Sequence, residues 1–105
     1  MFTPLGLDHL VLTVRDQAVS VRFYCDVLGC TVDHVNERIS LVQLRFGEQL
    51  IDLVPATDGP PAVSGGLNHF CLSVRCDDLA GTAKDLRALG VDVLGDPVER
   101  RGAYG

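Results

Sequence analysis

Apolar and polar side chains alternate along residues 7–15, LDHLVLTVR, and this alternation predicts a β-strand with two different faces. Leu10, Leu12 and Val14 share one face, which suits packing beneath a helix. His9 lies on the opposite face, which the helix does not cover. The first strand is therefore expected to place a histidine on the open side of a sheet.

A helical repeat follows this strand. Asp16 can act as the N-cap, and Val19, Phe23 and Val27 then recur at intervals of four residues, which places them on one helix face. Gly29 can adopt the left-handed conformation that ends a helix. The pattern predicts a helix that packs on the sheet through Val19, Phe23 and Val27, with Leu28 beside them.

Three further strands complete the first unit. Alternating and β-branched residues predict strands at residues 30–36, 39–46 and 49–54. Gly47 and Glu48, which separate the last two strands, are expected to form a two-residue hairpin turn. The predicted order is one strand, one helix and three strands, or βαβββ.

The second half of the chain repeats the first. Residues 67–75, LNHFCLSVR, are identical to residues 7–15 at five of nine positions with a constant offset of 60, and His69 is the counterpart of His9. Such self-similarity indicates one supersecondary unit used twice.

The repeat continues beyond this strand. A helix is predicted at residues 79–89, capped by Asp77 or Asp78 and ended by Gly90, and a strand is predicted at residues 91–94. The remaining residues are expected to form a loop, so the second copy lacks the last two strands of the first.

Together these patterns predict an α+β protein built from two related modules. The first βαβββ module is expected at residues 1–58, a linker rich in proline and glycine at residues 59–66, and an incomplete second module, βαβ plus a loop, at residues 67–105.

Composition narrows the possible functions. The net charge of −5 at pH 7 gives no basic surface for a nucleic acid or an anionic membrane. No apolar run approaches the roughly 20 residues of a membrane span, and the start of the chain does not resemble a secretory signal, so a cytoplasmic location is expected. A mean hydropathy of +0.22 is high for so small a chain and favours an oligomer.

The candidate chemistry centres on the repeated histidine. If both sheets curve with their helices outside, His9 and His69 point into a shared concave cleft and can bind one divalent metal. Imidazole suits zinc, iron, nickel and manganese. The alternative is that both histidines descend from one ancestral residue and have no ligand role.

The paired units, with L-D-H-L at residues 7–10, N-H-F at residues 68–70 and L-G after each helix, resemble the vicinal oxygen chelate superfamily of glyoxalases, bleomycin-resistance proteins and extradiol dioxygenases. The resemblance implies a metal site formed by His9 and His69. In glyoxalase I the last strand of module one adds a ligand, and Asp52 matches that position. The family's carboxylate on the last strand of module two has no counterpart in this sequence.

The resemblance implies a divalent-metal-dependent lyase or isomerase, or a dioxygenase, acting on a small substrate that chelates through adjacent oxygens. One alternative is a metal-free module that binds and sequesters a small molecule in the manner of bleomycin-resistance proteins. Another is a catalytically silent form that dimerises through its open sheet edge. A homodimer is expected, and the metal, whether Zn, Ni, Mn or Fe, is left open.

Overall fold

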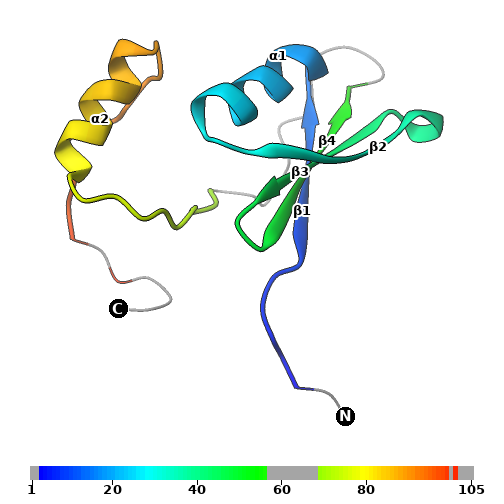
Figure 1. Cartoon of the computed structure of the whole chain (residues 1–105), viewed down its shortest axis with the longest axis horizontal. Coiled ribbons are helices and arrows are strands. Elements are labelled where there is room, and N and C mark those ends of the chain that lie inside the picture. The colour runs from blue at the N-terminus through cyan, green and yellow to red at the C-terminus, as the bar shows by residue number, and fades with distance from the viewer. Residues whose placement is uncertain (1–2, 57–68, 100, 102–105) are drawn as a thin grey trace. The chain divides into compact units, whose positions relative to one another are not determined.

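The computed structural model describes residues 3–56, 69–99 and 101 (Figure 1). The chain consists of two compact units, Met1–Leu67 and Asn68–Gly105. The elements of the first unit are β1 (His9–Val14), α1 (Gln17–Arg22), a π-helical turn (Phe23–Val27), β2 (Thr31–Asn36), a 3₁₀ turn (Glu37–Ile39), β3 (Leu41–Phe46) and β4 (Gln49–Pro55). The described element of the second unit is α2 (Leu79–Ala88).

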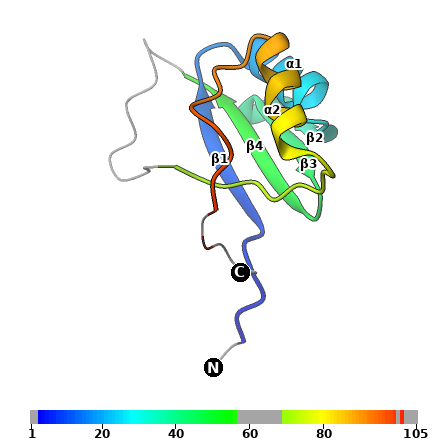
Figure 2. The same cartoon turned by 90° about the vertical axis from the view of Figure 1, so that its left-hand side faces the viewer.

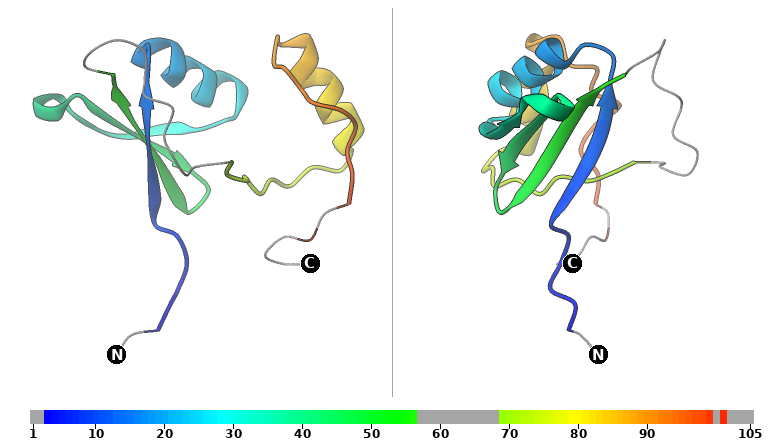
Figure 3. Two further views of the ribbon diagram at one scale, coloured as in Figure 1. Left: turned by 180° about the vertical axis from the view of Figure 1, so that it is seen from behind. Right: turned by 90° about the vertical axis from the view of Figure 1, so that its right-hand side faces the viewer.

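The first unit contains a four-stranded mixed sheet with the order β1-β4-β3-β2. β1 runs parallel to β4, and the two strands lie side by side in Figure 2 and in the right-hand view of Figure 3. β3 is antiparallel to both β4 and β2, so the chain forms a meander after its first strand and helix. This confirms the predicted α+β class and the βαβββ order of the first unit.

The core of the sheet lies on the face that α1 covers. Leu44, Ile51 and Leu53 are almost completely buried, with at most 2% of their surface exposed. On β1, Leu10 and Leu12 are half-buried on this same face, because they pair with Ile51 and Leu53. This confirms the prediction that Leu10 and Leu12 face the helix and that His9 lies on the opposite face of the sheet.

Both predicted ends of the first helix are confirmed. The Asp16 side chain accepts a hydrogen bond from the backbone N–H of Val19 at 3.1 Å, which is an N-cap. Gly29 ends the helical segment with φ of 79°, a conformation that costs glycine little because it has no Cβ.

The predicted packing face of this helix is right at its end and wrong at its start: Val27 and Leu28 are half-buried, as predicted. Val19 and Phe23 are 51% and 37% exposed. In the first turns of the helix the half-buried apolar side chains are instead Val21 and Tyr24, which lie three residues apart and on the same side as Leu28.

Gln17 explains why the start of the helix packs through a different side from the one predicted. Its side-chain amide donates hydrogen bonds to the backbone oxygens of Leu53 at 2.8 Å and Ser40 at 2.6 Å. These bonds turn the Gln17 side of the helix toward the sheet. Val21 lies one turn further along that side and becomes half-buried, whereas Val19 stays exposed.

The 3₁₀ turn Glu37–Ile39 replaces the predicted start of the third strand. Ser40, with φ of 53°, ends the turn in the left-handed conformation. β3 begins only at the next residue, so the predicted strand at residues 39–46 is two residues too long.

α2 confirms the helix predicted in the second unit. Asp78 caps it by accepting a hydrogen bond from the N–H of Gly81 at 3.0 Å, and Gly90 follows its end with φ of 87°. Ala83 is buried on the apolar side of the helix, and Leu86 is half-buried.

The strands predicted at residues 67–75 and 91–94 are not observed: the described parts, 69–75 and 91–94, carry no strand pairing. The first unit supplies the reason. There β1 pairs with β4 and β2 with β3, so counterparts of β1 and β2 are not neighbours and cannot pair with each other. Counterparts of β3 and β4 are absent from residues 69–99 and 101. Without a partner, an extended segment has no ladder hydrogen bonds to hold it as a strand.

Among the described residues, no helix has the length and apolar character needed to cross a bilayer.

Candidate metal-binding site

The open face of the sheet, opposite α1, carries two of the three candidate ligands. Asp52 pairs with Val11 in the parallel β1–β4 ladder, and His9 lies two residues before Val11 on the same strand. Paired residues share a face and side chains alternate along a strand, so His9 and Asp52 lie on one side of the sheet. The imidazole and the carboxylate are close enough for the Asp52 charge to raise the pKa of His9.

The Asp52 carboxylate is buried but only half satisfied. Asp52 is 3% exposed. Its Oδ2 accepts a hydrogen bond at 3.1 Å from Nε2 of Gln43, which faces it across the β3–β4 ladder. Its Oδ1 is buried and has no hydrogen-bond partner within the described part of the chain. Such an atom is uncommon, because an unsatisfied buried acceptor destabilises a fold.

His9 presents one ring nitrogen for a ligand. Its Nδ1 lies 2.7 Å from Oδ1 of Asp8, and the His9 side chain is 46% exposed. A carboxylate that accepts from one ring nitrogen favours the tautomer in which the other, Nε2, carries the lone pair. Metal-binding histidines commonly have such a partner.

The contact between His9 and Asp8 predicts a shifted pKa for His9 that can be measured. The hydrogen bond to Asp8 raises the pKa of His9 above the usual 6.5, against a lowering by desolvation, and the nearby Asp52 carboxylate raises it further. In metal-free protein, NMR titration of the ring protons should therefore give a pKa for His9 above 6.5, and Asp8→Asn should lower it. A His9 pKa that does not change in Asp8→Asn would show that the hydrogen bond is absent in solution.

The remaining candidate, His69, is exposed and belongs to the second unit. Its convergence with His9 stays a prediction. Over the described residues, no group of three or more His, Cys, Asp or Glu side chains is arranged to hold a metal ion. The donor set that the structure brings together in one unit is therefore His9 with Asp52. The orphaned Oδ1 and the oriented imidazole both fit a divalent ion.

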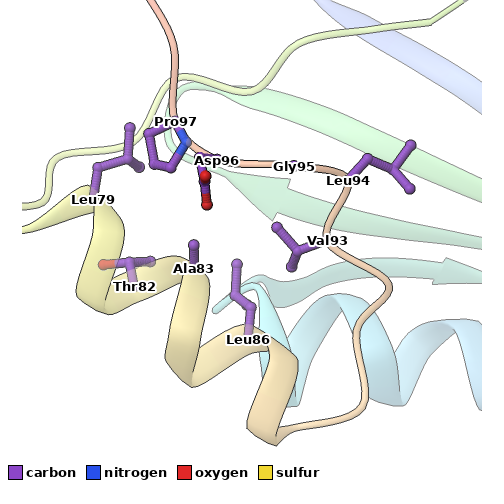
Figure 4. Close-up of a pocket in the computed structure, with 9 residues that line it drawn as sticks. All are labelled: Leu79, Thr82, Ala83, Leu86, Val93, Leu94, Gly95, Asp96 and Pro97. Carbon is purple, nitrogen blue, oxygen red and sulfur yellow. The ribbon is translucent and has the colours of Figure 1, made fainter.

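The second unit contains a hollow of a different kind. A cavity of about 240 Å³ lies between α2 and residues 93–97. Leu79, Ala83 and Leu86 of the helix line it from one side and Val93 from the other (Figure 4). Its lining is largely apolar, with Asp96 as the one ionisable side chain among the described residues there, and it contains none of the three candidate ligands.

Comparison with known proteins identifies the family. The profile of the Glyoxalase/Bleomycin resistance protein/Dioxygenase superfamily matches residues 6–103. The chain belongs to this superfamily. The match covers both units, and so confirms the resemblance inferred from the repeated histidine motifs.

Several proteins are similar to this superfamily member. Virulence protein STM3117 of Salmonella typhimurium is 32% identical over 104 residues, which cover 94% of this chain and 69% of that protein. Its crystal structure has a TM-score of 0.74 over 99% of this chain and 83% of that one. Glyoxalase domain-containing protein RDO1 of Mycosarcoma maydis is 33% identical, covering 95% of this chain and 57% of that protein.

Two residues of this superfamily member escaped the sequence analysis. Asp8 directly precedes the repeated histidine, and the signal was the D-H pair itself. Gln43 is a polar residue inside an otherwise apolar strand. The predicted turn at Gly47 and Glu48 fixes the hairpin register, because a two-residue loop leaves no freedom to shift it. That register already places residue 43 opposite Asp52.

Proposed function

We propose that this member of the glyoxalase superfamily is a divalent-metal-dependent protein acting on a small substrate that chelates through adjacent oxygens. Catalysis would be of the lyase or isomerase type, or a dioxygenation. The observation that carries the proposal is the buried Asp52 Oδ1, which lacks a partner within the described residues and lies on the same sheet face as His9. A bound cation would satisfy this oxygen.

Each residue has a distinct part in this proposal. His9 would donate its Nε2 lone pair, with the ring held by Asp8. Asp52 would contribute negative charge from a site that excludes water, where electrostatic attraction is stronger than in solvent. His69 would add a second imidazole from the second unit. A metal ion held in this way supplies Lewis-acid stabilisation of charge that develops on substrate oxygens.

We also propose that the protein acts as a homodimer. β1 and β2 are the edge strands of the sheet and pair on one side only within the described residues. Each carries an exposed apolar residue, Val11 at 55% and Val35 at 47%. Open strand edges and exposed apolar side chains are features that association commonly covers.

Calorimetric titration of the metal-free protein with Zn²⁺, Ni²⁺, Mn²⁺ or Co²⁺ tests the proposed metal dependence. We expect about one ion per site, bound with proton release if any ligand is protonated beforehand. Undetectable binding of all four ions would refute metal dependence. In that case, saturable binding of small apolar compounds would support the alternative, a metal-free module that sequesters its ligand.

A further inference from the structure

We propose that Gln43 is a positioning residue, which holds the Asp52 carboxylate so that Oδ1 is presented to the metal ion. This inference rests on the proposed metal dependence and extends it to a residue outside the ligand set. Gln43 lies at the centre of β3, opposite Asp52 in the antiparallel ladder, so the sheet backbone fixes the separation of the two side chains.

The hydrogen bond between the two side chains has only one chemically sensible direction. A carboxylate oxygen accepts hydrogen bonds, so the amide NH₂ group of Gln43 must face Oδ2 of Asp52, and the contact of 3.1 Å is a donation from Nε2. The bond restrains the rotation of the carboxyl group about its side-chain torsion. Because Oδ2 is taken, Oδ1 is the oxygen left for a ligand.

A purely structural role explains this arrangement poorly. A side chain selected only to satisfy Asp52 would leave neither oxygen orphaned, yet Oδ1 is buried and unpaired within the described part of the chain. In metal sites, a residue outside the ligand set commonly donates a hydrogen bond to one oxygen of a ligating carboxylate, and the other oxygen binds the metal. Gln43 and Asp52 have this hydrogen-bonding arrangement.

The test compares two isosteric substitutions. Gln43→Met keeps the length of the side chain and removes the donor, and Gln49→Met makes the same change at an exposed glutamine at the start of β4. Loss of an outer-shell partner commonly weakens metal binding about 10- to 100-fold. We expect the Co²⁺ dissociation constant to rise by that factor in Gln43→Met and to remain at the wild-type value in Gln49→Met.

A structural role and a positioning role are separated by measuring urea unfolding of the metal-free variants alongside Co²⁺ affinity. Weaker Co²⁺ binding with an unchanged unfolding midpoint supports positioning. If Gln43→Met does not fold, Gln43→Ile removes the same donor with a β-branched side chain that suits a strand. Wild-type affinity in a folded Gln43 variant overturns the inference and leaves the proposed metal dependence intact. No Co²⁺ binding by the wild-type protein overturns both.

Discussion

Replacing both repeated histidines should abolish metal binding. In the His9→Ala, His69→Ala double variant we expect the dissociation constant for Zn²⁺ or Ni²⁺ to rise by more than about 100-fold, because even the loss of an outer partner costs about 10- to 100-fold. Two imidazoles are removed, and the Asp52 carboxylate alone is a weak site for these ions. Isothermal calorimetry of the metal-free proteins measures the change.

His34 provides the matched control. It is an exposed histidine in register with Gln43, so it lies on the same sheet face as Asp52 but toward the other edge of the sheet. His34→Ala should leave the dissociation constant at the wild-type value. Equal losses in the control and in the double variant would mean that binding is non-specific attraction to surface imidazoles.

Removing the Asp52 carboxylate should stabilise the fold while weakening metal binding. Asp52→Val places a side chain of similar size, with good strand preference, at a site that is 3% exposed. It eliminates the orphaned Oδ1, and an unsatisfied buried polar group costs about 1–3 kcal/mol. We expect the free energy of unfolding of the metal-free protein to rise by about that amount. Gln43 is only half-buried, so its freed amide can bond to water.

Asp52→Asn separates charge from packing. It keeps an oxygen that can accept from Gln43 but removes the negative charge, so metal affinity should fall in this variant as well. Urea unfolding of both variants measures the free energy of unfolding, and calorimetric titration measures metal affinity. A destabilised Asp52→Val protein with wild-type metal affinity would show that the carboxylate serves the fold and not a ligand.

The first unit could be predicted from sequence because its signals are local. Strand alternation, the Asp16 cap, the stop at Gly29 and the two-residue turn each depend on residues within a few positions of one another. These signals agree with one another, and together they predict the order of the elements and which residues of β1 face the helix.

The predictions that were wrong depended on contacts that are distant in sequence. At the start of the first helix, Val19 and Val21 compete for the sheet, and the hydrogen bonds of Gln17 to Ser40 and Leu53 favour the side that carries Val21. The segments flanking α2 have the composition of strands, but a strand forms only where a neighbour supplies hydrogen bonds.

The sequence supplies the candidate ligands, whose joint role as a metal site stays a prediction, but not their burial or hydrogen bonding. The repeat identifies His9 and His69, and the family resemblance adds Asp52. The extreme burial of Asp52 and the orphaned Oδ1 follow from the packing of β4 between β1 and β3, which no local pattern records.

The central proposal is that His9 and His69 bind one metal ion. Titration of the metal-free protein with Co²⁺, followed by proton NMR, tests it directly, because the unpaired electrons of Co²⁺ shift the ring protons of a bound imidazole far from their ordinary positions. The account predicts that the ring signals of His9 and His69 move together and saturate at the same Co²⁺ concentration, while those of His34 do not shift in this way. Signals of His69 that stay in place while those of His9 move, or that saturate separately, would contradict it.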